Sequence, residues 1–364
     1  MPHLNNTDNN LPRPIPNTQQ QPPPPDPIID IPTIDIPIID IAGYLDQHPD
    51  PAATAHIAQQ IHRAARSPGF FQITGHGVAP ELRGRLFSSA ASLFALPAAA
   101  KAALHRDRSP AFRGYEGPGD QVLEPGVPDQ KEGFTVGAEW EGRGGGGDGD
   151  EAGDGDEAGA EAGFLQGRNQ WPAEGECPGF REVVGEYFEA MRGLSRAVFR
   201  LVALSLGLEE EWFDSFVASE DSVTVCRVHR YPPVTPEMAE KTRGIGAHTD
   251  FGGLTLLLQD DIGGLEVFHR PTQTWHPVKP VKDAFVVNIG DLMERWTNEV
   301  YTSTLHRVIS PVSDRNRYSV AFFNEGRRDQ IIECIPTCLK PGETPKYAPV
   351  QVESHLKKRY GGSY

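Results

Sequence analysis

The sequence predicts a mainly β protein with flanking helices. From Ser222 onward, apolar residues alternate or gather in short runs that Gly, Pro and Asp separate, whereas earlier apolar residues recur at three- and four-residue steps. The gaps between the runs lack helical patterns, which argues against a doubly wound parallel sheet. Several short strands at close spacing favour a sandwich or barrel, and we expect the helices to flank it.

Three helices are expected before the strands. The first spans residues 54–66, with Thr54 as its N-cap, and the second spans 80–94, with Pro80 at its first position. The third and longest spans 178–206, where apolar residues repeat for about seven turns. A helix of that length indicates a buttress against a sheet.

Six strands are expected in the second half of the chain. Each is a short apolar or alternating run, and the runs are Val223–Tyr231, Leu254–Gln259, Leu265–Phe268, Ala284–Ile289, Thr304–Ile309 and Tyr318–Asn324. We therefore divide the chain into a Pro-rich disordered tail (1–33), a mostly helical region (34–215), a strand-rich core (216–330) and a C-terminal segment (331–364).

The mostly helical region carries a biased insertion at 141–163. Ten of its 23 positions are Gly and eight are acidic, against one Arg. It lacks the Asp spacing and the twelfth-position Glu of a calcium loop, so we expect a flexible insertion.

Composition excludes several classes of protein. The net charge is −16, which argues against a nucleic-acid partner, and no apolar stretch is long enough to span a membrane. The four cysteines are too few and too irregularly spaced for a disulfide framework. We expect a soluble, cytoplasmic and monomeric protein with free thiols.

The sharpest chemical signal is His248-Thr249-Asp250, followed 56 residues after the Asp by His306. Positions i and i+2 of an extended segment share a face, so His248 and Asp250 can converge with a His from a distant strand. Two His and one carboxylate with open positions suit non-haem Fe(II) that handles O2. Taken alone, a His in such a pattern is more often an ordinary polar or hydrogen-bonded residue than a metal ligand.

A second signal is Arg317-Tyr318-Ser319, eleven residues after His306. Arg317 and Ser319 share a strand face, where a guanidinium beside a hydroxyl can bind a carboxylate. The alternative is a surface ion pair. The apolar run that follows argues against that alternative, because a charge leading into buried sequence needs a partner.

The chain resembles the isopenicillin N synthase-like branch of the Fe(II)/2-oxoglutarate-dependent oxygenases. The resemblance covers roughly residues 34–360 without the insertion. It is carried by ordered motifs at 36–40, 69–78, 230–233, 248–250, 253–257, 264–267, 288–291, 306–307 and 317–319. It implies a double-stranded β-helix (jelly-roll) core in which His248, Asp250 and His306 hold Fe(2+).

The resemblance also implies that Arg317 and Ser319 hold the distal carboxylate of 2-oxoglutarate, with the Tyr231 hydroxyl close by. Tyr115 and Phe134 fall where this branch often lines the substrate pocket, although loop packing is equally expected. His229 stands where many plant members have Asn. A helix at 352–360 could cover the mouth of the barrel.

The implied activity is a dioxygenase that uses O2 and 2-oxoglutarate to oxidise a C–H bond of a small molecule, by hydroxylation, desaturation or ring closure, in secondary metabolism. Two alternatives remain open. The first is a 2-oxoglutarate-independent non-haem iron oxidase whose substrate carboxylate occupies the Arg-x-Ser pair. The second is a binding module without O2 chemistry, which an intact His-Asp-His set disfavours.

Overall fold

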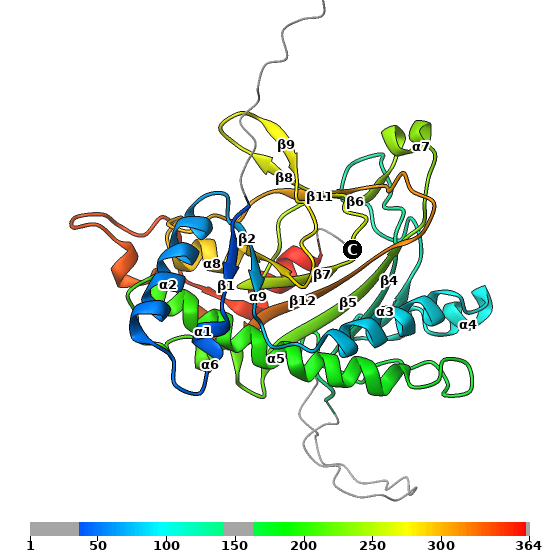
Figure 1. Ribbon diagram of the computed structural model, residues 1–364, viewed down its shortest axis with the longest axis horizontal. Coiled ribbons are helices and arrows are strands. Elements are labelled where there is room, and N and C mark those ends of the chain that lie inside the picture. The colour runs from blue at the N-terminus through cyan, green and yellow to red at the C-terminus, as the bar shows by residue number, and fades with distance from the viewer. Residues whose placement is uncertain (1–35, 141–162, 362–364) are drawn as a thin grey trace, which may run out of the picture. The chain divides into compact units, whose positions relative to one another are not determined.

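The computed structural model describes residues 36–140 and 163–361. The predicted tail and residues 141–162 of the insertion lie outside the described residues. Within the described ranges, two sheets face each other, one above and one below in Figure 1. This arrangement of antiparallel strands in facing sheets confirms the predicted jelly roll, a mainly β core with flanking helices.

The larger sheet has eight strands. In their order across the sheet, they are β1 (Ile38–Asp40), β2 (Phe70–Thr74), β10 (Phe285–Ile289), β7 (Leu254–Gln259), β12 (Arg317–Arg327), β5 (Ser222–Tyr231), β4 (Glu132–Gly137) and β3 (Gly114–Glu116). All neighbours are antiparallel except β1 and β2. The region predicted as mostly helical therefore also supplies four strands, β1 to β4. Their sequences gave a weak signal because β2 and β4 are buried on both faces and do not alternate.

The smaller sheet has four strands and carries both predicted histidine ligands. Its order is β6 (Arg243–His248), β11 (His306–Ile309), β8 (Leu265–His269) and β9 (Thr274–Pro277). A separate two-stranded ribbon joins β13 (Ile331–Ile332) to β14 (Val350–Gln351). The two sheets thus place residues that are far apart in sequence around one interior.

Helices cover the outer face of the larger sheet, below it in Figure 1. The α-helices are α1 (Ala42–Leu45), α2 (Pro51–Arg66), α3 (Pro80–Phe94), α4 (Ala98–Ala103), α5 (Phe180–Ser205), α6 (Asp214–Val217), α7 (Pro236–Lys241), α8 (Asp291–Trp296) and α9 (Val352–Tyr360), and two short 3-10 turns lie at Arg106–Arg108 and Pro336–Cys338. The helix α5 contacts β7 and β12, as a buttress should. Its buried stripe, which includes Val198 and Phe199, lies in the main core.

The start of α2 differs from the prediction. The helix begins at Pro51, and Asp50, not Thr54, is its N-cap: the Asp50 carboxylate accepts hydrogen bonds from the backbone N–H groups of Ala52 and Ala53. Pro51 favours this start because its fixed φ suits the first helical position. Thr54 lies one turn inside, where its buried hydroxyl has no hydrogen-bond partner.

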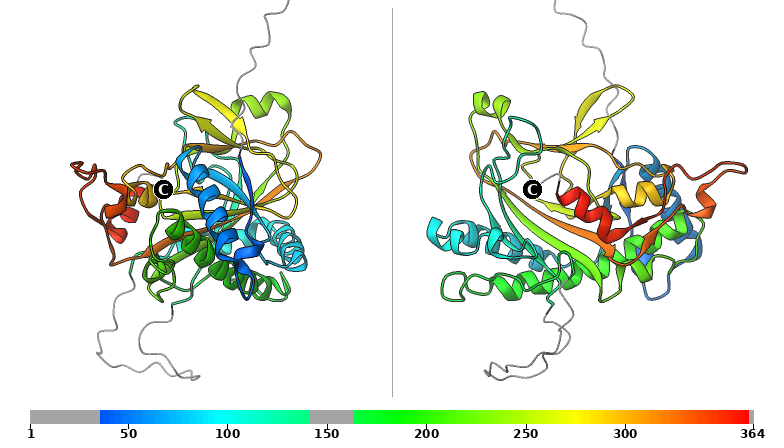
Figure 2. Two further views of the ribbon diagram at one scale, coloured as in Figure 1. Left: turned by 60° about the vertical axis from the view of Figure 1, so that its left-hand side comes forward. Right: turned by 180° about the vertical axis from the view of Figure 1, so that it is seen from behind.

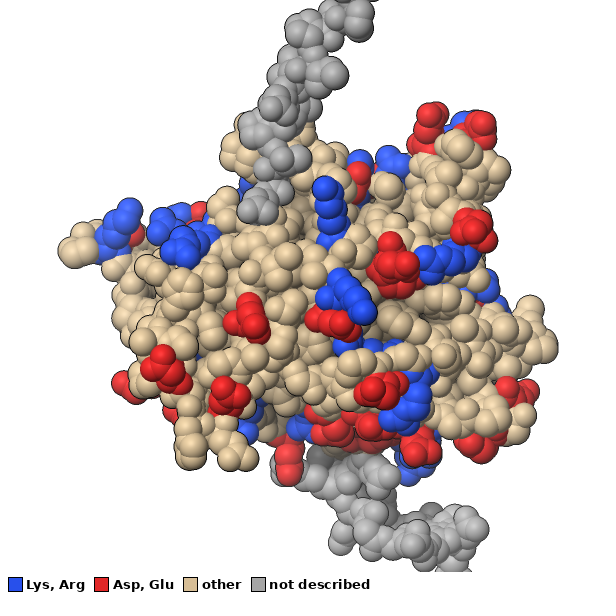
Figure 3. Space-filling view, viewed as in Figure 1, with Lys and Arg blue, Asp and Glu red and all other residues tan. Residues whose placement is uncertain are grey.

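The surface shows no dominant charge on the side that Figure 3 presents. There, acidic and basic side chains are interspersed, and no continuous basic patch of the kind that binds nucleic acid is visible. None of the helices in the described ranges combines the length and the apolar character that crossing a membrane requires.

Candidate active site

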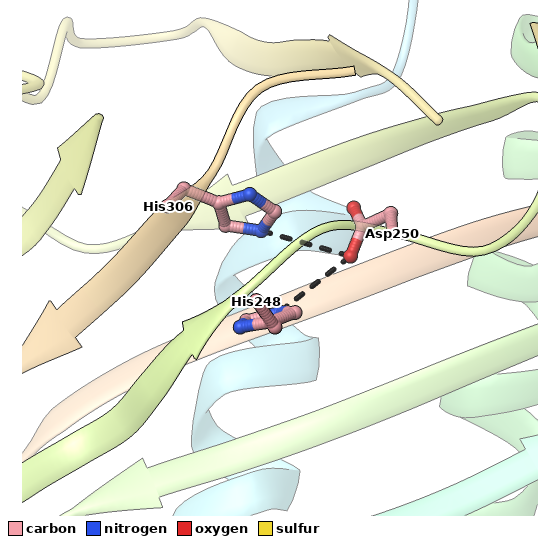
Figure 4. A group of neighbouring side chains, drawn as sticks. All are labelled: His248, Asp250 and His306. Carbon is pink, nitrogen blue, oxygen red and sulfur yellow. Dashed lines mark ion pairs between the residues drawn. The ribbon is translucent and has the colours of Figure 1, made fainter. Parts of the chain in front are cut away.

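His248 and His306 face each other across two neighbouring strands. In the antiparallel register of β6 and β11, the two residues are direct partners, and their ring centroids lie 4.3 Å apart. Asp250 follows β6 by two residues and turns its Oδ1 toward both rings, 3.6 Å from each Nε2 (Figure 4). Because metal–ligand distances to N and O are about 2.0–2.2 Å, atoms 3.6 Å apart can contact one ion.

Hydrogen bonds orient both imidazoles toward that common point. Nδ1 of His248 lies 2.8 Å from the carbonyl oxygen of Gly246, and Nδ1 of His306 lies 3.0 Å from that of Thr304. A carbonyl can only accept, so each Nδ1 carries the proton and each Nε2 keeps its lone pair. This is the tautomer that a metal-binding histidine needs.

Asp250 is oriented in the same way. Its Oδ2 accepts a hydrogen bond from the Thr255 hydroxyl and another, at 2.7 Å, from the Asn288 amide. The other oxygen, Oδ1, is therefore the one that faces the two histidines. Among the described residues, these three side chains form the only cluster with the donor atoms and spacing for a metal ion. Thr255 and Asn288 lie in the motifs at 253–257 and 288–291, but nothing in the sequence pattern indicated that they contact Asp250.

The electrostatics also favour a bound cation. Burial, together with repulsion from His306, lowers the pKa of His248 to about 4, so the ring is neutral at pH 7. Burial alone would raise the pKa of Asp250, but the two imidazoles and the hydrogen bonds from Asn288 and Thr255 outweigh it and lower the pKa. The group thus combines two imidazoles with one carboxylate, a donor set that fits a divalent ion of borderline softness.

The outer edge of β6 is held by two carboxylates from the segment that precedes β4. Oδ1 of Asp129 accepts a hydrogen bond from the Gly246 N–H, and Oε1 of Glu124 accepts one from the Ala247 N–H, both at 2.9 Å. These contacts replace a neighbouring strand. They fix the backbone directly before His248.

The helix α9 holds the other side of the Asp250 segment. The Arg359 guanidinium donates to the Thr249 carbonyl and hydroxyl oxygens, at 3.2 and 3.0 Å, and pairs with Asp291 at 3.1 Å. Nε2 of His355 lies 3.0 Å from the Phe251 carbonyl oxygen. Figure 2 shows α9, in red, across the near side of the molecule when it is seen from behind. The predicted helix at 352–360 is present, and a lid function for it stays a prediction.

Two cavities of about 60 Å³ each meet at the His-Asp-His set and share His248 and Asp250. We call the one lined by Tyr231, Arg317 and Ser319 the inner cavity, and the one lined by Lys131, Phe251 and Tyr360 the outer cavity. A single water needs a cavity of roughly 10–15 Å³. Each of these cavities is several times larger, so each admits a ligand of several atoms. A larger surface hollow, of about 1120 Å³ between α1, α2 and α5, contains no residue of the set.

The inner cavity contains a guanidinium without an acidic partner. Arg317 is fully buried, its Nη2 donates to Oε1 of Gln259 at 3.1 Å, and its Nε and Nη1 have no hydrogen-bond partner. Ser319 lies on the same strand face, with its Oγ 3.3 Å from the Tyr231 hydroxyl. A buried charge is costly unless it is paired. Arg317 therefore does not form the surface ion pair expected as an alternative, and two of its buried donor atoms remain without a hydrogen-bond acceptor.

Tyr115 and Phe134 line neither cavity. They are direct partners between β3 and β4, on the helix-facing side: Phe134 is fully buried against Phe180 of α5, and the Tyr115 hydroxyl donates to Glu132 at 2.6 Å. The residue of this segment that reaches the outer cavity is Lys131, three positions before Phe134 and on the opposite face. A substrate contact for Tyr115 or Phe134 stays a prediction that their positions do not support.

A jelly roll whose facing sheets bring two histidines and one carboxylate to a point beside two cavities defines the class of non-haem iron oxygenases. Comparison with known families specifies the class further. Residues 36–174 match the family described as non-haem dioxygenase in morphine synthesis N-terminal, and residues 221–326 match the 2OG-Fe(II) oxygenase superfamily. The chain belongs to this superfamily and is an Fe(II)- and 2-oxoglutarate-dependent dioxygenase, which confirms the resemblance seen in the sequence.

Individual relatives agree over most of the chain. The 2-oxoglutarate-Fe(II) type oxidoreductase hxnY of Emericella nidulans is 41% identical over 318 residues, which cover 86% of this chain and 87% of the relative. The crystal structure of full-length T7H of Neurospora crassa in complex with alpha-KG has a TM-score of 0.75 at 30% identity, covering 90% of this chain and 96% of that one. That of JOX2 in complex with 2OG, Fe and JA has a TM-score of 0.71 at 31% identity, with coverages of 89% and 84%.

Proposed function

We propose that this enzyme oxidises a C–H bond of a small organic molecule of secondary metabolism, with His248, Asp250 and His306 as the iron ligands and Arg317, Ser319 and Tyr231 as the 2-oxoglutarate contacts. The observation that carries the proposal is the pair of cavities that meet at the His-Asp-His set, one of which ends at an unpaired buried guanidinium. The outcome is hydroxylation, desaturation or ring closure.

The β12 side chains that line the cavities support placing 2-oxoglutarate in the inner cavity and the substrate in the outer one. Arg317, Ser319, Ala321 and Phe323 alternate along one face, and Phe323 lines both cavities. At about 3.3 Å per residue, Arg317 and Phe323 are separated by roughly 20 Å of strand. A dicarboxylate held at Arg317 thus extends from there toward the His-Asp-His set, and the outer cavity remains for the substrate.

Each residue has a defined part in the reaction. Arg317 neutralises the distal carboxylate, the hydroxyls of Ser319 and Tyr231 can donate to it, and the apolar walls Phe70, Leu257 and Val308 exclude water. Bound Fe(II) with 2-oxoglutarate supplies O2 activation coupled to decarboxylation of the 2-oxo acid. For hydroxylation, the substrate R–H, O2 and 2-oxoglutarate give R–OH, succinate and CO2.

An oxidase that uses no 2-oxoglutarate is the second candidate, because the same Arg317 and Ser319 could bind a substrate carboxylate. The two cavities favour the first candidate. If the substrate occupied the inner cavity, the equally large outer cavity, with its own buried polar groups, would have no ligand to bind.

An anaerobic titration of the Fe(II)-loaded protein with 2-oxoglutarate tests the proposal. The chelate has a weak visible charge-transfer band, which gives the apparent affinity. Arg317→Met keeps the apolar bulk but removes a charge-assisted contact worth roughly 1.5–3 kcal/mol, so the affinity should fall by about ten- to a hundredfold. The control is Arg315→Met, since Arg315 is exposed and pairs with Asp261 outside the cavities. A wild-type protein that forms no band would contradict the 2-oxoglutarate assignment.

The cytoplasmic location and the monomeric state, expected from the sequence, remain predictions.

A further inference from the structure

The outer cavity contains polar groups that neither iron nor 2-oxoglutarate requires. Beyond the His-Asp-His set, its polar lining consists of Gln121, Lys131, Arg227, His229 and Glu325, and its apolar lining includes Leu123, Ile245, Phe251, Phe323 and Tyr360. Polar side chains in an interior are costly unless something pairs with them. Their arrangement therefore carries information about the ligand.

Lys131 is the central cation of this lining. It is 2% exposed, and its ammonium pairs with Oε1 of Glu116. The other oxygen of Glu116 pairs with Arg106 at 2.7 Å, and Glu116 is itself 1% exposed. Glu116 thus lies between two buried cations. Of the two cations, only Lys131 lines the outer cavity.

Gly133 makes this ion-pair cluster possible. A Cβ at position 133 would lie 2.5 Å from Oε1 of Glu116, which is too close for any side chain. Gly133 is also the direct partner of His229 across β4 and β5. The absent side chain therefore leaves room for Glu116 and its pair with Lys131 next to the inward face of β5.

His229 supplies a second unpaired group. It is 4% exposed, lines both cavities, and its Nε2 has no hydrogen-bond partner. Burial, with repulsion from Lys131, holds the pKa of this imidazole well below its usual range, so the ring is neutral. A neutral ring in the Nε2–H tautomer can donate one hydrogen bond to an acceptor that Lys131 also attracts.

Nearby carboxyls do not take the place of that acceptor. Oδ1 of Asp129 is bonded to the Gly246 N–H and its buried Oδ2 has no hydrogen-bond partner, but Asp129 lines neither cavity. Glu325 does line the outer cavity, but burial, with repulsion from Asp250, raises its pKa to about 8. At pH 7 this carboxyl is mostly neutral and offsets no cation.

We propose that the outer cavity selects substrates that carry a carboxylate, which Lys131 binds by charge and His229 by a hydrogen bond, with an apolar body against Phe251 and Tyr360. The inference rests on the proposed function, because the outer cavity is the substrate side only if 2-oxoglutarate occupies the inner one. The rings of Phe251 and Tyr360, whose centroids lie 5.5 Å apart, give that body an aromatic wall.

The test uses the anaerobic Fe(II)–2-oxoglutarate complex and three acids, namely benzoate, phenylacetate and hexanoate, each beside its uncharged amide. Calorimetry measures binding at saturating 2-oxoglutarate, and the visible band shows whether 2-oxoglutarate stays bound. In the wild type, at least one acid should bind tenfold or more tightly than its amide without loss of the band.

Two variants assign that preference to its residues. The double variant Lys131→Met/Glu116→Gln removes both charges of the pair and should reduce the preference of acid over amide by tenfold or more. His229→Asn should reduce it less. The control is Arg243→Gln, because Arg243 pairs with Glu124 outside the cavities. This variant should keep the preference of acid over amide.

The possible failures are distinct. If no 2-oxoglutarate band forms, the proposed function is wrong. If the band forms but no acid is preferred over its amide, if the acid displaces 2-oxoglutarate, or if the double variant keeps the preference, then the carboxylate inference is wrong while the proposed function stands.

Discussion

Asn288 donates a hydrogen bond from its side-chain amide to Oδ2 of Asp250, at 2.7 Å, although the two residues are 38 positions apart. Asn288 lies in β10 of the larger sheet, whereas Asp250 follows β6 of the smaller one. The bond therefore connects the two sheets at the carboxylate ligand. It leaves Oδ1 as the oxygen that faces His248 and His306.

Replacing Asn288 with Ala should weaken iron binding. The carboxylate would lose one of its two side-chain donors, and loss of such supporting contacts typically costs 10–100-fold in metal affinity or activity. The affinity for Fe(II) can be measured by anaerobic competition with a chromogenic chelator. Asn316→Ala, outside both cavities, is the matched control. An unchanged affinity in Asn288→Ala would show that Thr255 alone orients Asp250.

His306→Ala should abolish turnover and most iron binding while the fold is retained. The β11 strand keeps its backbone pairing with β6 and β8 regardless of this side chain. Circular dichroism and melting of the iron-free protein report the fold, and the chelator competition reports the metal. Wild-type turnover by this variant would contradict the assignment of His306 as a ligand.

Buried neutral histidines should make the iron-free protein sensitive to acid. The pKa of His248 is lowered to about 4 and that of His229 well below its usual range. Between pH 6.5 and 4, the unfolded chain binds these protons and the folded chain does not, so the free energy of unfolding falls as the pH falls. Each histidine contributes up to about 1.4 kcal/mol per pH unit.

Denaturant unfolding of the wild type and His229→Asn across this pH range isolates one of these contributions. Glu325, whose raised pKa has the opposite effect on stability, is present in both proteins and cancels in the difference. The variant should show the shallower loss of stability toward acid. Equal slopes would mean that His229 is protonated in the folded protein.

Arg359→Ala should loosen the segment between His248 and Phe251. The variant loses the hydrogen bonds to Thr249 and the ion pair with Asp291, and we expect iron to dissociate faster. Lys357→Ala is the control on the same helix, because Lys357 pairs with Glu353 instead. Stopped-flow mixing with a chelator measures the rate. Equal dissociation rates for both variants would show that α9 does not restrain the site.

The strand parity that places the iron ligands was predictable from the sequence. His248 and Asp250 are two positions apart, and so are Arg317 and Ser319, which is enough to put each pair on one face. The structure adds which strands are neighbours: His306 is opposite His248, and Arg317 is opposite Tyr231. Those pairings join segments up to 86 positions apart and depend on the whole sheet.

The same parity rule explains why the position of Phe134 does not support a substrate contact. Phe134 was associated with the substrate pocket, but Lys131, three positions before it, lines the outer cavity, and this odd separation puts the two residues on opposite faces. An aromatic residue was a reasonable choice for a pocket wall. Which face turns inward depends on the register with β5, and no local signal in the sequence reveals it.

Parallel measurement of O2 uptake and succinate formation tests the central claim most directly. The Fe(II)-loaded protein is given 2-oxoglutarate, with and without each compound of a small-molecule panel, and both quantities are recorded in one vessel. Succinate should form in equal amount to the O2 consumed, and Arg317→Met should need about ten- to a hundredfold more 2-oxoglutarate for the same rate. O2 consumption without succinate would contradict the account and favour the 2-oxoglutarate-independent oxidase.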